Sequence, residues 1–65
     1  MRQGLIKLRG DRSRKEIADN LNITPQMLGS IERGDRNPSL ELAINIAKKY
    51  KITMDRLIFL LNIDT

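Results

Sequence analysis

The sequence predicts an all-α fold, a compact bundle of five short helices. Leucine and isoleucine recur at intervals of three and four residues along much of the 65-residue chain, which is the spacing of one helix face. A serine or threonine precedes four of the apolar segments, where its hydroxyl can cap a helix N-terminus. Strand signals are absent, because no alternation of period two persists and β-branched residues are few.

The first two helices are expected over residues 2–9 and from residue 14 to about 21. Gly10 ends the first of them. Ser13 followed by Glu16 is a capping box, in which the hydroxyl accepts from an amide of the first turn and the carboxylate reaches back. The second helix therefore has a well-defined start.

The third helix is expected over residues 25–33, because Thr24 is a good N-cap and Pro25 a good first helical residue. Asn22 stands at the corner before it, where a left-handed backbone is expected. Ala18 lies where the second and third helices would approach most closely. Five apolar side chains would share one core: Ile17, Leu21, Ile23, Leu28 and Ile31. Two helices joined by so tight a turn form a helix-turn-helix, whose second helix is shaped to enter the DNA major groove.

The fourth and fifth helices are expected after a segment rich in turn formers, residues 34–38. Ser39 caps the fourth helix, and Thr53 caps the fifth, which begins at residue 54. The fourth helix carries an apolar stripe: Leu40, Ala43, Ile44, Ile46 and Ala47. A chain of this length allows one small domain, residues 1–65.

The composition excludes several classes of site. The chain has no cysteine and no histidine, which removes disulfides, the usual nucleophile–base pairs and nearly all zinc chemistry. We therefore expect that the protein is not an enzyme, that it binds no metal and no cofactor, and that it is cytoplasmic. No apolar run approaches the roughly 18–20 residues that span a bilayer, and no signal peptide is expected. The formal net charge of +4 favours a polyanionic partner.

The chain resembles the lambda-repressor-like helix-turn-helix family, of the Cro type or xenobiotic-response-element type, over about residues 5–58. The resemblance rests on SRKEIADNLNIT, on SIERGDRNPSLE and on the spacing between them, and IERGDRNPSLELAINIAKKY is especially similar. It implies a compact five-helix bundle in a bacterial or phage regulator. It also implies sequence-specific binding of double-stranded DNA, mostly by dimers.

The resemblance assigns base reading to the third helix. Thr24, Gln26, Met27 and Ser30 match the positions from which family members reach bases and adjacent phosphates. The Gln26 amide can pair with adenine N6 and N7, whereas Met27 could contact a thymine methyl or pack back onto the second helix. Gly29 departs from the family: it could let the backbone approach DNA closely, or leave that base pair unread.

Phosphate contacts are expected around this helix. Arg14 stands where the family typically has Gln, so its charge could bind a phosphate and its longer side chain could extend to a base. Ser13 adds amides at a helix N-terminus. Glu32 matches an internal, structural position of the family. Further candidates for the DNA backbone are Arg12, Lys15, Arg33, Arg36 and Asn37, although Arg33 could instead pair with Asp35.

The last helix carries more apolar residues than a small monomer can bury. Met54, Leu57 and Ile58 match positions that the family buries against the fourth helix. The apolar run then continues through Phe59, Leu60, Leu61 and Ile63. Because an exposed apolar patch marks an interface, residues from about 54 to 63 are expected to form a homodimer. The alternative is that this segment folds back onto the core of its own monomer.

Two functions are compatible with these features. The first is a transcriptional regulator, most simply a dimeric repressor that reads a palindromic operator with the third helix in the major groove. It would act at the nucleoid of a prokaryote or on phage DNA. The second is an antitoxin or adaptor that binds a protein partner through the apolar C-terminal helix.

Overall fold

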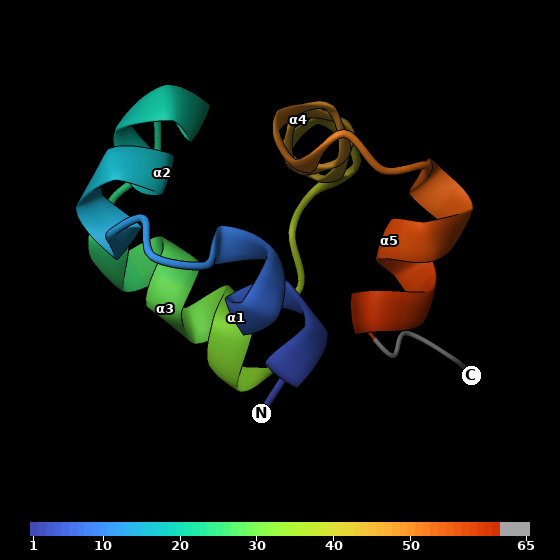
Figure 1. Cartoon of the computed structure of the whole chain (residues 1–65), viewed down its shortest axis with the longest axis horizontal. Coiled ribbons are helices and arrows are strands. Elements are labelled where there is room, and N and C mark those ends of the chain that lie inside the picture. The colour runs from blue at the N-terminus through green and yellow to red at the C-terminus, as the bar shows by residue number, and fades with distance from the viewer. Residues whose placement is uncertain (62–65) are drawn as a thin grey trace.

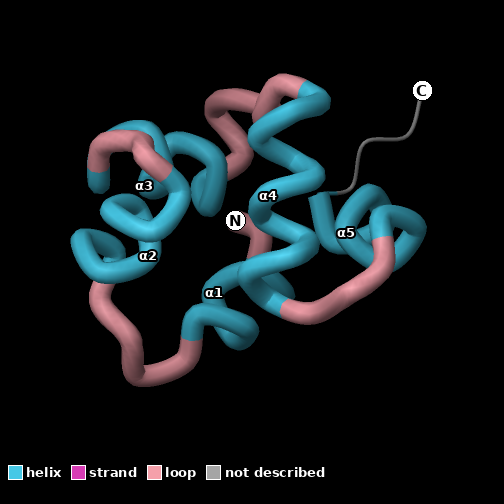
Figure 2. The backbone as a smooth tube through the Cα atoms, turned by 90° about the horizontal axis from the view of Figure 1, so that it is seen from above, coloured by secondary structure: helices cyan, strands magenta, loops and turns pink. Residues whose placement is uncertain are grey.

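The computed structural model describes residues 1–61, and within this range the chain is all-helical. The five helices are α1 (Gln3–Arg9), α2 (Arg14–Leu21), α3 (Pro25–Arg33), α4 (Leu40–Tyr50) and α5 (Met54–Leu61). Figure 1 shows α2 and α3 on one side of the molecule and α5 on the other, with α1 and α4 between them. Figure 2 shows the same order from above. The all-α prediction is confirmed, with helix bounds within one or two residues of those expected.

Each of the last four helices begins at a hydroxyl cap. Every cap accepts a hydrogen bond from the amide three residues ahead, at distances of 3.0 to 3.2 Å. The caps are Ser13, Thr24, Ser39 and Thr53. Such a bond satisfies one of the amides that a helix start leaves without a partner. In the capping box only the hydroxyl half forms, since no bond from the Ser13 amide to the Glu16 carboxylate occurs within residues 1–61.

The corner of the helix-turn-helix is built on Asn22. Its backbone is left-handed, with φ 58° and ψ 40°, and the Ile23 amide donates to the Ala18 carbonyl at 3.0 Å. This pattern closes a Schellman turn, as Asn at this position predicted. Lys51 makes the same turn after α4, with φ 58° and ψ 45°, although no pattern in the sequence predicts a left-handed lysine.

The core lies among the five helices, each of which contributes at least one buried apolar residue. Ala18 is fully buried, and Ile23 packs on the core from the corner. The fully buried large side chains include Ile17, Ile31, Ile46 and Leu57. The shared core predicted for the helix-turn-helix is therefore confirmed.

The buried face of α4 differs from the predicted stripe. Leu40 is 73% exposed and Ile44 is 37% exposed, whereas Leu42 is buried. The core face is instead the set Leu42, Ala43, Ile46 and Ala47. Apolar residues make up more than half of this helix, so their spacing alone does not decide which face is buried; α2 and α5 are the helices that pack against α4.

Arg2 ties the start of α1 to the end of α5, a role that no local pattern indicated. Its Nε donates to the Leu61 carbonyl at 2.8 Å. Its Nη1 donates to the carbonyls of Ile31 at 2.9 Å and Arg36 at 3.0 Å, and its Nη2 donates to Asn37 Oδ1. One guanidinium thus joins the end of α3, the loop that follows it and the end of α5. None of the helices in the described part of the chain is long and apolar enough to cross a membrane.

Candidate nucleic-acid interface

The outward face of α3 (Gln26, Gly29, Ser30 and Arg33), here called the reading face, is the candidate surface for reading DNA bases. Leu28 and Ile31 point into the core, so the residues three and four apart on the other side face outward. Gln26 is exposed and Ser30 is half-buried. The Thr24 hydroxyl is occupied as the cap of this helix, accepting from the Met27 amide at 3.1 Å.

Met27 lies at the edge of this face. It is half-buried and packs against the core, and its sulfur accepts a hydrogen bond from Arg36 Nη1 at 3.2 Å. This contact holds the Arg36 guanidinium, from the loop after α3, beside the N-terminal half of the helix.

Behind the reading face, a buried carboxylate joins three segments. Glu32 is 0% exposed, as its match to an internal family position implied. It accepts from Arg9 Nε at 2.8 Å and from Arg14 Nε at 3.1 Å. The Arg9 side chain is 16% exposed and that of Arg14 is 43% exposed. Glu32 therefore fixes the end of α1 and the start of α2 against α3, and it points one edge of the Arg14 guanidinium inward.

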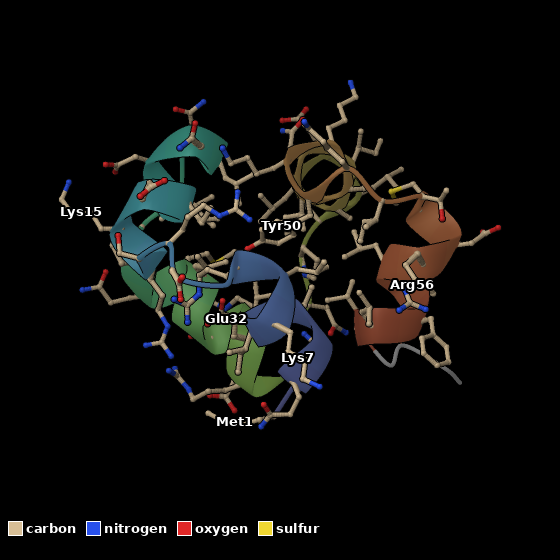
Figure 3. All side chains as sticks on the ribbon, in the orientation of Figure 1. Met1, Lys7, Lys15, Glu32, Tyr50 and Arg56 are labelled. Carbon is tan, nitrogen blue, oxygen red and sulfur yellow. The ribbon has the colours of Figure 1, made fainter. Side chains whose placement is uncertain are left out.

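The Arg12 side chain makes contacts within the protein rather than pointing into solvent. Its guanidinium donates to the carbonyls of Leu8 at 2.7 Å and Arg9 at 3.1 Å. It also stacks over the Tyr50 ring, 5.6 Å from the centroid, a favourable cation–π distance. In Figure 3, Tyr50 and Glu32 both lie in the middle of the molecule. Burial raises the pKa of the Tyr50 phenol, and the Glu32 charge raises it further.

The other residues predicted to contact the DNA backbone lie at the start of α2 and at the end of α3. Ser13 and Arg14 lie together at the start of α2, and Arg33 lies at the end of α3. Arg33 Nε pairs with Asp35 at 3.0 Å, the alternative that the sequence left open. Lys15 pairs with Asp19 at 3.1 Å and points away from the bundle in Figure 3.

Arg14 and Arg33 lie over Gly29. Gly29 is buried although it stands on the outward stripe of α3. A shallow depression of about 300 Å³ opens here, lined by Arg14, Pro25, Gln26, Gly29 and Arg33. The sequence singled out all of these residues except Pro25 as features of the interface, but nothing in it predicted that they share one hollow.

Two arginines of structural importance were missed at the sequence level, Arg2 and Arg9. A signal for Arg9 existed: Glu32 lies in the apolar part of the third helix, and a buried carboxylate needs a cationic partner. The partner lies 23 residues away, so only the fold identifies it.

Only some of the apolar residues predicted to be exposed on α5 are exposed in the structure. Phe59 is 73% exposed and Ile58 is 45% exposed, so Ile58 is not buried as the family match implied. Leu60 is half-buried against the core. Leu61 is 1% exposed, so its assignment to an exposed patch is wrong, because the position four residues after Leu57 shares its inward face. Ile63 lies outside the described residues.

A helix-turn-helix with a polar, arginine-flanked second helix defines the class of DNA-binding transcription regulators. The comparisons agree: the chain belongs to the Helix-turn-helix family of the Cro/C1 type, whose model matches residues 5–57. This family is generally non-enzymatic. The resemblance seen in the sequence is thereby confirmed.

A similar protein occurs in Bacillus subtilis (strain 168), where it is described as an uncharacterized HTH-type transcriptional regulator, YgzD. The two are 31% identical over 55 residues, which cover 85% of this chain and 83% of the relative. No solved structure matches the chain.

Proposed function

We propose that this protein is a dimeric transcriptional repressor that reads a palindromic operator in a prokaryotic or phage setting. The observation that carries this proposal is the outward face of α3, which presents Gln26 and Ser30 while Leu28 and Ile31 hold the helix in the core. Repression would follow from occupying a promoter, with α3 inserted in the major groove.

Affinity would come from phosphates and specificity from α3. The electrostatic part would come from cations near α3, Arg36 from the loop that follows it and Lys15 from α2. The amides around Ser13 would bind a phosphate at the start of α2. Arg12 would contribute less, because it is half-buried and its guanidinium donates to two backbone carbonyls. Asn37 would offer only its amide nitrogen, because its Oδ1 accepts from Arg2.

Base reading would centre on Gln26, with Thr24, Met27 and Ser30 beside it. The test begins by selecting bound sequences from a random DNA pool. Gln26→Ala should then weaken operator binding about 10-fold or more while leaving binding to random DNA unchanged. Gln3→Ala, on α1, is the matched control and should change neither. Equal losses on operator and random DNA would remove Gln26 from base reading.

Phosphate contact has a different signature. Arg36→Ala should weaken binding to all sequences and reduce the slope of log K against log salt by about 1. Lys48→Ala, on α4, removes the same charge and should leave the slope unchanged. An unaltered slope in Arg36→Ala would exclude this contact.

The dimer would form through the exposed part of α5. Phe59 and Ile58 supply the apolar surface, with Arg56 stacked 5.9 Å from the Phe59 ring centroid. Two-fold pairing would place two α3 helices roughly 34–36 Å apart, one turn of DNA. The selected operator should then show two inverted half-sites at that spacing.

Sedimentation of two matched variants tests the interface. Phe59→Asp should convert a dimer to a monomer, whereas Leu40→Asp should not, although both wild-type residues are 73% exposed. A wild-type monomer at high micromolar concentration would contradict the dimer. It would favour the second candidate, an antitoxin or adaptor that offers Phe59 and Ile58 to a different protein.

A further inference from the structure

Gly29 is shielded from solvent, although it lies on the face of α3 that is expected to be exposed. It stands on the outward stripe of α3 between Gln26 and Arg33, yet it is buried. A Cβ added to it would lie 3.2 Å from Arg33 Nη1 and 3.8 Å from Arg14 Nη1. Two guanidinium groups therefore converge on the same point of the helix, and a Cβ at residue 29 would press only on the Nη1 of Arg33.

Each of the two guanidiniums is anchored by its other edge. Arg14 is held through Nε by the buried Glu32 at 3.1 Å. Arg33 is held through Nε by Asp35 at 3.0 Å and through Nη2 by the Ser30 hydroxyl at 3.2 Å. The Nη1 groups that remain point over Gly29. Arginine carries donors only, so a partner at this point must offer acceptors.

We propose that Arg14 and Arg33 over Gly29 form a guanine-reading site, with Arg14 as the principal donor. This inference rests on the proposed function, in which α3 enters the major groove. The major-groove edge of guanine presents two adjacent acceptors, O6 and N7, and arginine is their usual partner. Adenine presents a donor at N6 in place of O6, which opposes a guanidinium donor.

The position of the site favours a base over a phosphate. The depression is lined by Gln26 and Gly29, both on the outward stripe of α3, so it opens on the side of the helix that would face the bases. Because Gly29 has no side chain, the two Nη1 groups lie close against α3 there and can meet a base edge on the outward side of the helix. Arg14 thus takes over the base reading that the missing side chain of residue 29 cannot perform.

The first experiment uses modified operators. Sequences selected from a random pool should carry a guanine at one fixed position of each half-site. Replacing that guanine by 7-deazaguanine removes N7 and should weaken wild-type binding about 10-fold. Inosine keeps O6 and N7 and should bind as guanine does. Arg14→Ala should lose the guanine preference and show no further loss with 7-deazaguanine.

Two outcomes would overturn the inference. One is an Arg14→Ala variant that still prefers guanine at the same position. The other is an Arg14 contact that responds to methylphosphonate at a neighbouring phosphate and not to 7-deazaguanine, which would make Arg14 a phosphate ligand. In both cases specific DNA binding survives, so the proposed function stands. Failure to select any sequence would instead overturn the proposed function and the inference together.

Substitution of Gly29 tests the site without touching either arginine. Gly29→Leu adds a good helix former whose side chain would fill the depression and displace both guanidiniums. The variant should keep its circular dichroism spectrum and its binding to random DNA, and lose the preference for guanine. Gly29→Ala meets only the Nη1 end of the flexible Arg33 side chain tightly, so it should retain most of that preference. Undiminished guanine preference in Gly29→Leu would contradict the proposal.

Discussion

Removing the buried carboxylate of Glu32 should lower the stability of this small domain strongly, because two arginines from other helices bind it. Its side chain is 1% exposed, and it accepts from Arg9 at 2.8 Å and from Arg14 at 3.1 Å. Removing one partner of a buried ion pair typically costs about 3–5 kcal/mol, because the other charge is left buried and unpaired. We expect Glu32→Ala to lie near the lower end, about 3 kcal/mol, since Arg14 is 43% exposed and regains water.

That loss is large for a chain of this size. At roughly 0.05–0.15 kcal/mol per residue, 65 residues carry a total stability on the order of 3–10 kcal/mol. Urea unfolding followed by circular dichroism at 222 nm would measure the change. Glu32→Gln keeps the shape and loses the charge, and should cost about 1.5–3 kcal/mol. Glu41→Ala, an exposed acid at the start of α4, should cost below about 1 kcal/mol.

Double-mutant cycles divide the effect between the two arginines. The Arg9 side chain is 16% exposed, so its coupling to Glu32 should exceed about 1.5 kcal/mol. The half-exposed Arg14 should couple by less than about 1 kcal/mol. A Glu32→Ala loss below about 1 kcal/mol, or equal couplings to both arginines, would refute this account of the network.

Three further predictions concern α4, α5 and the turn between them. Burial raises the pKa of Tyr50 in the folded protein above the 10.0 of an exposed phenol. The buried neutral phenol therefore contributes to the free energy of unfolding below pH 10, and this contribution is lost as the pH rises through the folded-state pKa. Tyr50→Phe should therefore lose less stability than wild type as the pH rises above 10.0, as measured by urea unfolding at a series of pH values, and identical pH profiles would contradict this. Lys51→Gly should raise stability by about 1 kcal/mol, because Lys51 has φ 58°, whereas Lys49→Gly in the helix should lower it by about as much; the opposite order would refute the strain. Thr53→Ala should cost about 1 kcal/mol, roughly 4–8 °C in Tm, by removing the cap on the Arg56 amide; a similar loss in Thr53→Ser would argue against the cap.

Features set by a few neighbouring residues could be predicted from the sequence. The caps at Thr24 and Ser39 and the left-handed corner at Asn22 each depend on one side chain and the backbone within four residues. Such signals do not require knowledge of the fold. The helix-turn-helix followed from them together with the buried positions of α2 and α3.

Features set by distant partners could not be predicted. On α4 and α5 the apolar residues exceed what one face can hold, so the neighbouring helices decide that Leu42 and Leu61 are buried and that Leu40 and Phe59 are exposed. The candidate site shows the same division. Gly29 was recognisable as a departure from the family, but its cover of two guanidiniums depends on contacts between separate helices.

The Arg2 guanidinium has a consequence for how the domain opens. Its bond to the Leu61 carbonyl joins residues 59 positions apart, and the same group holds the Ile31 carbonyl at the end of α3. A contact of such sequence separation forms only after most of the chain is ordered, because the loop it closes spans nearly the whole protein. Terminal helices ordinarily fray independently of the domain centre. Here, detachment of α1 or α5 disturbs the guanidinium that also holds the end of α3, so we expect amide hydrogen exchange in α1 and α5 to be linked to opening of the whole domain.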